Sequence, residues 1–177
     1  VAREVDHQSR DLIRRAEPAA ALMIVGGGPY RRKLESLIKA TGQQQHVVMT
    51  GSVPYADLPA HYAAGDVFAM PCRTRNRGLD VEGLGIVYLE ASATGIPVVA
   101  GDSGGAPDAV VAGETGFVVQ GGSVAQAAQR VTQILTDPEL ANRMGTAGRA
   151  WIESTWQWPK IAARLTDLLD GVDPDAH

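Results

Sequence analysis

The chain has 177 residues, of which 45% are hydrophobic and 20% charged, a composition typical of a globular protein and unlike a disordered or fibrous one. This length suits one domain with a sizeable core. The formal net charge of −4 excludes the strongly basic surface that general nucleic-acid binding requires.

Cysteine content and hydropathy indicate the cellular compartment to expect. Cys72 is the only cysteine, which excludes a disulfide framework and favours a reducing compartment. No apolar run approaches the roughly 20 residues that span a bilayer. The segment Val1–Asp6 resembles neither a signal peptide nor a transit sequence. We therefore expect a cytoplasmic protein whose contact with a membrane, if it has one, is peripheral.

Short apolar runs alternate with helical patterns. In chain order, the predicted elements are strand 22–25, helix 29–40, strand 47–50, helix 57–64, strand 67–70, helix 85–94, strands 97–100 and 116–119, and helices 123–136, 139–153 and 158–169. Pro29 suits a first helical turn because its missing N–H has no partner there. Gly95 is a usual residue just beyond a helix C-terminus.

The predicted strands are apolar without alternation. Such strands, separated by helices, indicate a mostly parallel sheet covered on both faces. The fold class is therefore α/β, with a doubly wound, Rossmann-like sheet. Ligands of such sheets bind beyond the carboxyl ends of the strands, which here are the loops after Val25, Thr50, Met70 and Ala100.

The segment from Arg73 to Glu90 is the strongest candidate site. Gly83 and Gly85 flank the start of a predicted helix, where free N–H groups and the helix dipole favour a diphosphate. Glu82 precedes the helix and Glu90 lies one turn into it, so both carboxylates suit hydrogen bonds from hydroxyls beside that diphosphate. The structural alternative is that both are solvated charges at a helix end.

The nine residues Glu82–Glu90 resemble the E-x7-E motif of the family 4 retaining glycosyltransferases, which have the GT-B fold. Four further segments resemble turns of the same family, at residues 24–28, 50–54, 103–108 and 113–116. In the third of these, Asp108 replaces the usual glutamate. Segment 70–82 is similar to one subgroup, the actinobacterial phosphatidylinositol mannosyltransferases that add a second mannose.

The resemblance implies that residues 1–170 form the donor-binding, C-terminal half of a GT-B enzyme. Glu82, the residue that the resemblance makes catalytic, would hold hydroxyls of the donor sugar, and Glu90 would accept hydrogen bonds from the ribose. Val53 would lie against the base. The residues lining the sugar and diphosphate would be Gly83, Leu84, Gly85, Ile86 and Val87.

The resemblance also implies the chemistry. The family transfers its sugar with retention and without a metal or cofactor, and the leaving phosphate helps to deprotonate the acceptor. GDP-mannose is the expected donor, and a phosphatidylinositol mannoside-type lipid, met at the inner face of the plasma membrane, is the expected acceptor. Two alternatives stay open: a family 4 enzyme using a UDP-sugar, or a sugar-nucleotide-binding module without activity of its own.

Other features are weaker. The Gly26–Gly28 loop invites a dinucleotide-binding interpretation, but Arg31 stands where the last glycine is needed, and no acidic residue closes a second strand about 20 residues later. The arginines of the loop, Arg73, Arg75 and Arg77, suit a diphosphate, an anionic phospholipid or solvent equally. The four histidines have no metal-ligand spacing.

Two parts of the family pattern are missing. Nothing corresponds to the N-terminal Rossmann-like domain that supplies the acceptor site. The family's donor domain also begins with a strand and a basic loop, and only Arg3-Glu4 falls near that loop. We therefore expect the chain to be a fragment whose sheet further polypeptide completes, and a monomer that folds cooperatively alone would contradict this. Residues 171–177 are expected to form an acidic tail.

Overall fold

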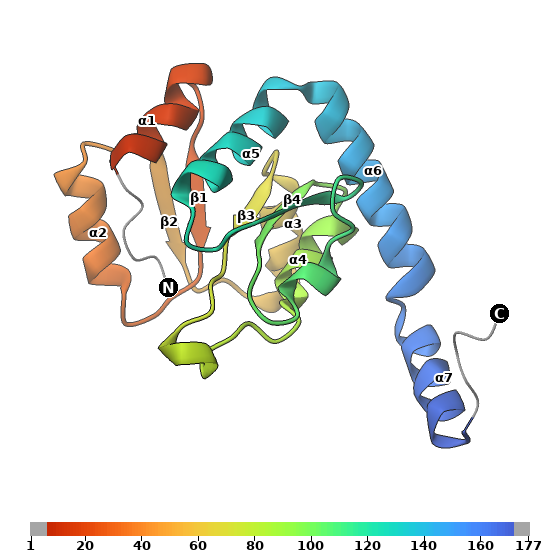
Figure 1. Cartoon of the computed structure of the whole chain (residues 1–177). Helices are drawn as coiled ribbons and strands as arrows, with labels where there is room; N and C mark the ends of the chain where they lie inside the picture. Colours follow the sequence, from red (N-terminus) through yellow and green to blue (C-terminus); the bar gives the residue numbers. More distant parts are fainter. Residues whose placement is uncertain (1–6, 172–177) are drawn as a thin grey trace.

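A computed structural model describes residues 7–171, and Figure 1 shows its arrangement. The expectations for Arg3-Glu4 and for all of the acidic tail beyond Gly171 lie outside the described residues. The elements in chain order are α1 (His7–Ala16), β1 (Leu22–Val25), α2 (Arg31–Ala40), β2 (Val47–Gly51), η1 (Tyr55–Asp57), α3 (Leu58–Ala63), β3 (Phe68–Met70), η2 (Asn76–Gly78), α4 (Ile86–Ala93), β4 (Val98–Gly101), η3 (Ala106–Ala109), β5 (Gly116–Val119), α5 (Val124–Thr136), α6 (Pro138–Thr155) and α7 (Trp158–Leu169).

Every predicted strand and helix is present, with boundaries that differ by at most a few residues. Besides the short 3-10 helices, the element that sequence patterns did not predict is α1, whose composition is dominated by polar and charged residues. It packs against α5. Contact with a helix more than 100 positions away in the sequence leaves little trace in local periodicity.

The strands form two parallel ladders. One pairs β1 with β2, and the other has the order β3-β4-β5. The parallel α/β class is as predicted. The single continuous sheet is not seen, because no described strand hydrogen-bonds to both β1 and β3. Leu22 and Met23 of β1 remain 55% and 37% exposed. That a further strand completes the sheet stays a prediction.

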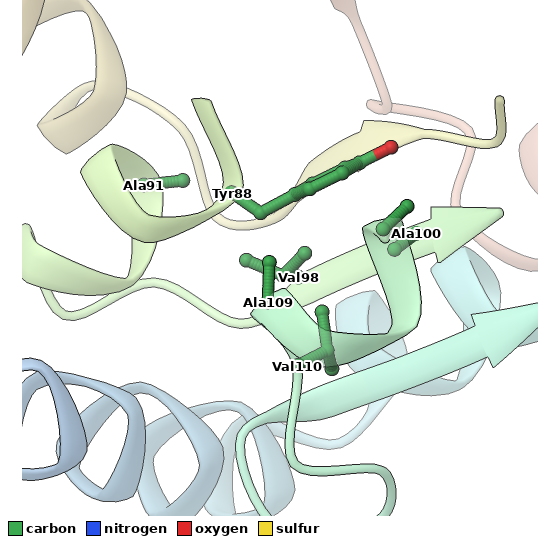
Figure 2. Close-up of a cluster of buried hydrophobic side chains, with 7 residues drawn as sticks. Tyr88, Ala91, Val98, Ala100, Ala109 and Val110 are labelled. Atoms are coloured by element: carbon green, nitrogen blue, oxygen red, sulfur yellow. The ribbon is translucent and has the colours of Figure 1, made fainter. Parts of the chain in front are cut away.

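The core is built on β4. All four of its residues are buried, as expected for a central strand with helices on both faces. Val98 and Ala100 face a cluster with Tyr88 and Ala91 of α4, and Figure 2 shows the Tyr88 ring lying over this strand. Val99 belongs to a second cluster with Ile134 of α5. α4 is therefore anchored to the most buried strand of the protein.

Of the C-terminal helices, α6 packs against α4 and has four buried residues, whereas α7 extends away from the body of the protein (Figure 1). Trp151 and Trp156 pack edge to face with ring centroids 5.7 Å apart, as expected for tryptophans that pack the last helices. Trp158 does not share this role, since 81% of its surface is exposed. Leu165 and Leu169 on α7 are also exposed.

We expect the buried Tyr88 to make the protein sensitive to alkali. Its hydroxyl donates to the carbonyl O of Met70 at 2.7 Å, and burial followed by the contact with Cys72 raises the pKa of this phenol above its ordinary value. The folded protein therefore keeps a proton that the unfolded chain loses above about pH 10. Below that pH the contribution of Tyr88 is complete. Above it this one group should lower the free energy of unfolding by about 1.4 kcal/mol per pH unit, in addition to any contribution of Tyr62.

Urea unfolding between pH 8 and pH 11 measures this slope. Tyr88→Phe should lower the free energy of unfolding at pH 8 by about 1–2 kcal/mol, because the Met70 carbonyl loses its donor, and should flatten the alkaline slope. Tyr55→Phe is the matched control, since 79% of the Tyr55 surface is exposed. An unchanged slope in Tyr88→Phe would show that another group controls the alkaline transition.

Candidate functional site

The segment Glu82–Glu90 leads from a loop into α4, as the sequence predicts. Gly85 stands at the N-cap with φ +73°, a left-handed conformation that favours glycine. A Cβ atom there would also overlap the ring of Tyr88. No side chain caps the described N-terminus of α4. The Tyr88 N–H donates to the Gly85 carbonyl at 2.9 Å, which leaves the N–H groups of Ile86 and Val87 for an anionic ligand.

The turn Ser103-Gly104-Gly105 after β4 fixes the backbone of Glu82 and Gly83. The Glu82 N–H donates to Ser103 Oγ at 3.2 Å, and the Gly105 N–H donates to the carbonyl oxygens of Glu82 at 3.2 Å and Gly83 at 2.7 Å. A Cβ on Gly104 would overlap the Glu82 carbonyl, and one on Gly105 would overlap the Gly83 carbonyl. Both glycines are therefore needed for this close approach.

One of the two carboxylates precedes this helix start in the chain, and the other lies within α4. Glu82 is half-buried and its charge contributes, after burial and Cys72, to raising the pKa of Tyr88. Glu90 is half-buried on α4, and Tyr62 of α3 donates to its Oε2 at 2.8 Å. Burial, and then this hydrogen bond, raise the pKa of the Tyr62 phenol. The partnership with Tyr62 is a contact that sequence reasoning missed.

The three side chains expected to line the donor differ in exposure. Leu84 packs against the buried cluster below α4, so its side chain contributes to the core. Ile86 exposes 64% of its surface, and Val87 is half-buried. Their backbone groups stand at the helix start together with those of Gly83 and Gly85. Contact between these residues and a donor stays a prediction.

Val53 lies elsewhere, in the loop that follows β2 at the carboxyl end of the other ladder, and is half-buried. The neighbouring Ser52 meets the first glycine loop, because a Cβ on Gly27 would lie 2.7 Å from Ser52 Oγ. A hollow of about 250 Å³ runs along Gly26–Gly28 and is lined also by Leu34 and Met49. The loop expected to hold the base thus adjoins a partly apolar hollow.

The loop that carries Arg73, Arg75 and Arg77 is held together by internal contacts. Arg75 forms an ion pair with Asp80 at 2.5 Å, and their backbones exchange hydrogen bonds of 2.8 and 3.2 Å. Between them, Asn76 and Arg77 have φ near +50°, which is uncommon outside glycine. The Arg75 side chain is thereby engaged within the loop. Arg73 and Arg77 are exposed, and either can face an anion.

A second hollow, of about 370 Å³, lies at the carboxyl ends of β3, β4 and β5. Its lining residues are Arg73, Thr74, Asp102, Gln120, Gly121 and Gly122. Thr74 Oγ1 lies 3.0 Å from Ser103 Oγ, so the hollow adjoins the turn that holds Glu82. Asp102 and Gln120 were not expected from the sequence. Their position directly after β4 and β5 is the signal that could have found them.

Two further findings concern residues 7–171 only. No three of their histidine, cysteine, aspartate and glutamate side chains lie together as a metal would need. None of their helices has both the length and the apolar character required to cross a bilayer.

Comparison with known proteins identifies the family. Residues 8–151 match the family model of glycosyl transferases group 1. The chain is 55% identical over 161 residues to the GDP-mannose-dependent alpha-(1-6)-phosphatidylinositol monomannoside mannosyltransferase of Mycobacterium tuberculosis, covering 91% of this chain and 42% of that protein. A Corynebacterium glutamicum enzyme that acts on the monoacylated form is 49% identical over 154 residues, covering 87% of this chain and 40% of that protein. The chain therefore spans about two fifths of the length of these relatives.

Solved structures show the same fold. Anabaena HepE in complex with UDP superposes with a TM-score of 0.80 at 24% identity, covering 95% of this chain and 45% of that one. The C-terminal domain of the glycosyl transferase LpcC from Francisella tularensis superposes with a TM-score of 0.73 at 21% identity, covering 86% and 77%. The described architecture is thus that of one half of a GT-B enzyme, and the chain belongs to the group 1 glycosyltransferases.

Proposed function

We propose that this chain is the donor-binding half of a retaining mannosyltransferase that uses GDP-mannose and a phosphatidylinositol mannoside-type lipid. The observation that carries the proposal is the uncapped start of α4, with Glu82 before it and Glu90 after it in the chain and with the backbone of Glu82 held by the turn at Ser103. The 55% identity to a mannosyltransferase supports the choice of donor and acceptor.

Each residue then has a role that its position permits. The N–H groups of Gly83 through Val87 bind the diphosphate, and the helix dipole adds to this attraction. Glu82 accepts hydrogen bonds from hydroxyls of the mannose, and Glu90 from those of the ribose. Val53 lies against the guanine. Arg73, which is exposed and lines the hollow next to the Ser103 turn, offsets part of the charge of the diphosphate.

The reaction needs no general base from this chain. The bond between the sugar C1 and the diphosphate oxygen breaks, and a bond from C1 to the acceptor oxygen forms on the same face. The acceptor hydroxyl gives its proton to the departing phosphate oxygen. The chain contributes by binding and orienting the donor, without a metal ion. The acceptor site belongs to the further polypeptide that the longer relatives have, and contact with the inner face of the membrane is peripheral.

Donor binding tests the roles of the two glutamates. Calorimetric titration should show GDP-mannose binding more tightly than UDP-glucose or NAD. Glu82→Ala and Glu90→Ala should each weaken it about 10- to 100-fold, because each removes hydrogen bonds to a charged acceptor. Glu139→Ala, at an exposed position on α6, is the control.

The outcomes separate the alternatives. Tighter binding of UDP-glucose would indicate another donor for the same site. Binding without transfer, even in a chimera where these residues replace the matching part of the Mycobacterium tuberculosis relative, would indicate a binding module. GDP-mannose bound no more tightly than NAD would contradict the proposal.

Gly105→Ala tests whether the turn after β4 positions the site. The added methyl group must displace the Gly83 carbonyl, so the start of α4 should shift and GDP-mannose affinity should fall at least tenfold. Gly122→Ala is the matched control, because no atom lies within 4 Å of a Cβ there. Far-UV circular dichroism should be native-like for both variants. Unchanged affinity in a folded Gly105→Ala protein would show that this contact does not position the donor.

A further inference from the structure

The carboxylate of Glu90 is held by a hydroxyl from another helix. Tyr62 of α3 donates to Glu90 Oε2 at 2.8 Å, although the two residues are 28 positions apart in the sequence. Both side chains are half-buried. A hydrogen bond between a phenol and a carboxylate is charge-assisted and stronger than a neutral one.

The Tyr62 ring is itself fixed by packing. It meets Phe68 of β3 edge to face, with centroids 5.5 Å apart, and Phe68 meets Tyr88 in the same way at 5.9 Å. Tyr88 is fully buried and its hydroxyl donates to the Met70 carbonyl. The position of the Tyr62 hydroxyl is thus set by the core before any ligand arrives.

This contact leaves the carboxylate free to act on a ligand. A carboxylate has about four lone-pair sites, and Tyr62 uses one of those on Oε2. The terminal torsion of a glutamate is otherwise broad, so an unheld carboxylate would lose rotational freedom on binding. Because burial and Glu90 raise its pKa, the phenol remains a donor throughout the neutral range.

We infer that Tyr62 is a positioning residue, which orients the Glu90 carboxylate toward the two ribose hydroxyls of a nucleoside diphosphate. The inference rests on the proposed function, in which Glu90 accepts from the ribose. Tyr62 itself does not touch the ligand. Removal of the Tyr62 hydroxyl should therefore weaken the binding of only those nucleotides that carry the ribose hydroxyls.

The test compares the binding of GDP and 2′,3′-dideoxy-GDP to the 177-residue protein and to Tyr62→Phe. The variant keeps the ring and its contact with Phe68 and loses only the hydroxyl. GDP affinity should fall about three- to tenfold, whereas the dideoxy nucleotide should bind equally to both proteins. Tyr55→Phe, at an exposed tyrosine, should leave both affinities unchanged.

A double-mutant cycle completes the test. In a Glu90→Ala background, Tyr62→Phe should have no further effect on GDP, because the carboxylate that it positions is gone. Equal losses for both nucleotides, or an undiminished loss in the Glu90→Ala background, would overturn the inference in favour of a purely structural role. A preference for GDP over 2′,3′-dideoxy-GDP by the same factor in the wild-type protein and in Tyr62→Phe is another outcome. That result would overturn the positioning role of Tyr62 and leave the ribose role of Glu90 intact. Wild-type protein that binds both equally would overturn the ribose role of Glu90 as well.

Discussion

The contact between the turn Ser103–Gly105 and the backbone of Glu82 and Gly83 determines where the candidate site lies. Three hydrogen bonds and two glycines without room for a Cβ bring these segments together. The turn follows β4, whose residues are all buried, so the loop before α4 is hydrogen-bonded to the turn that leaves the most buried of the described strands. The position of Glu82 therefore follows from the core, and that of Glu90 from the helix that the loop begins.

Sequence patterns predicted those parts of the fold that depend on local order. The uniformly apolar strand at β4 predicted its burial on both faces, and Gly85 predicted the helix start. They could not predict pairs brought together by topology, such as Tyr62 with Glu90. They also missed the ion pair of Arg75 with Asp80, which depends on the left-handed turn between them, because side-chain type alone gives no backbone angle.

The division of the strands into two ladders bears on how a nucleotide would bind. Val53 follows β2 in one ladder, whereas Glu82 and Glu90 follow β3 in the other. No strand hydrogen bonds join the ladders among residues 7–171, and the described link between these two parts includes the packing of α1 on α5. A donor whose base and sugar contact both parts would tie them together. Any ligand that binds only the folded arrangement stabilises it by mass action, so donor and fold stability should be coupled.

The row of aromatic rings formed by Tyr62, Phe68 and Tyr88 bears on how the proposed site would place two carboxylates beside a diphosphate. Glu90 is hydrogen-bonded at one end, and the charge of Glu82 acts on the phenol at the other. Both phenols keep their protons because burial raises their pKa values, so Tyr62 and Tyr88 add no negative charge. In the proposed site, Tyr62 orients the Glu90 carboxylate and the Ser103 turn holds the backbone of Glu82. Both carboxylates would then accept from hydroxyls, and the N–H groups at the start of α4 would be left to the phosphates. In that arrangement a bare diphosphate would meet the same repulsion from the carboxylates without the hydroxyl contacts, so the sugar and ribose hydroxyls would be the source of selectivity.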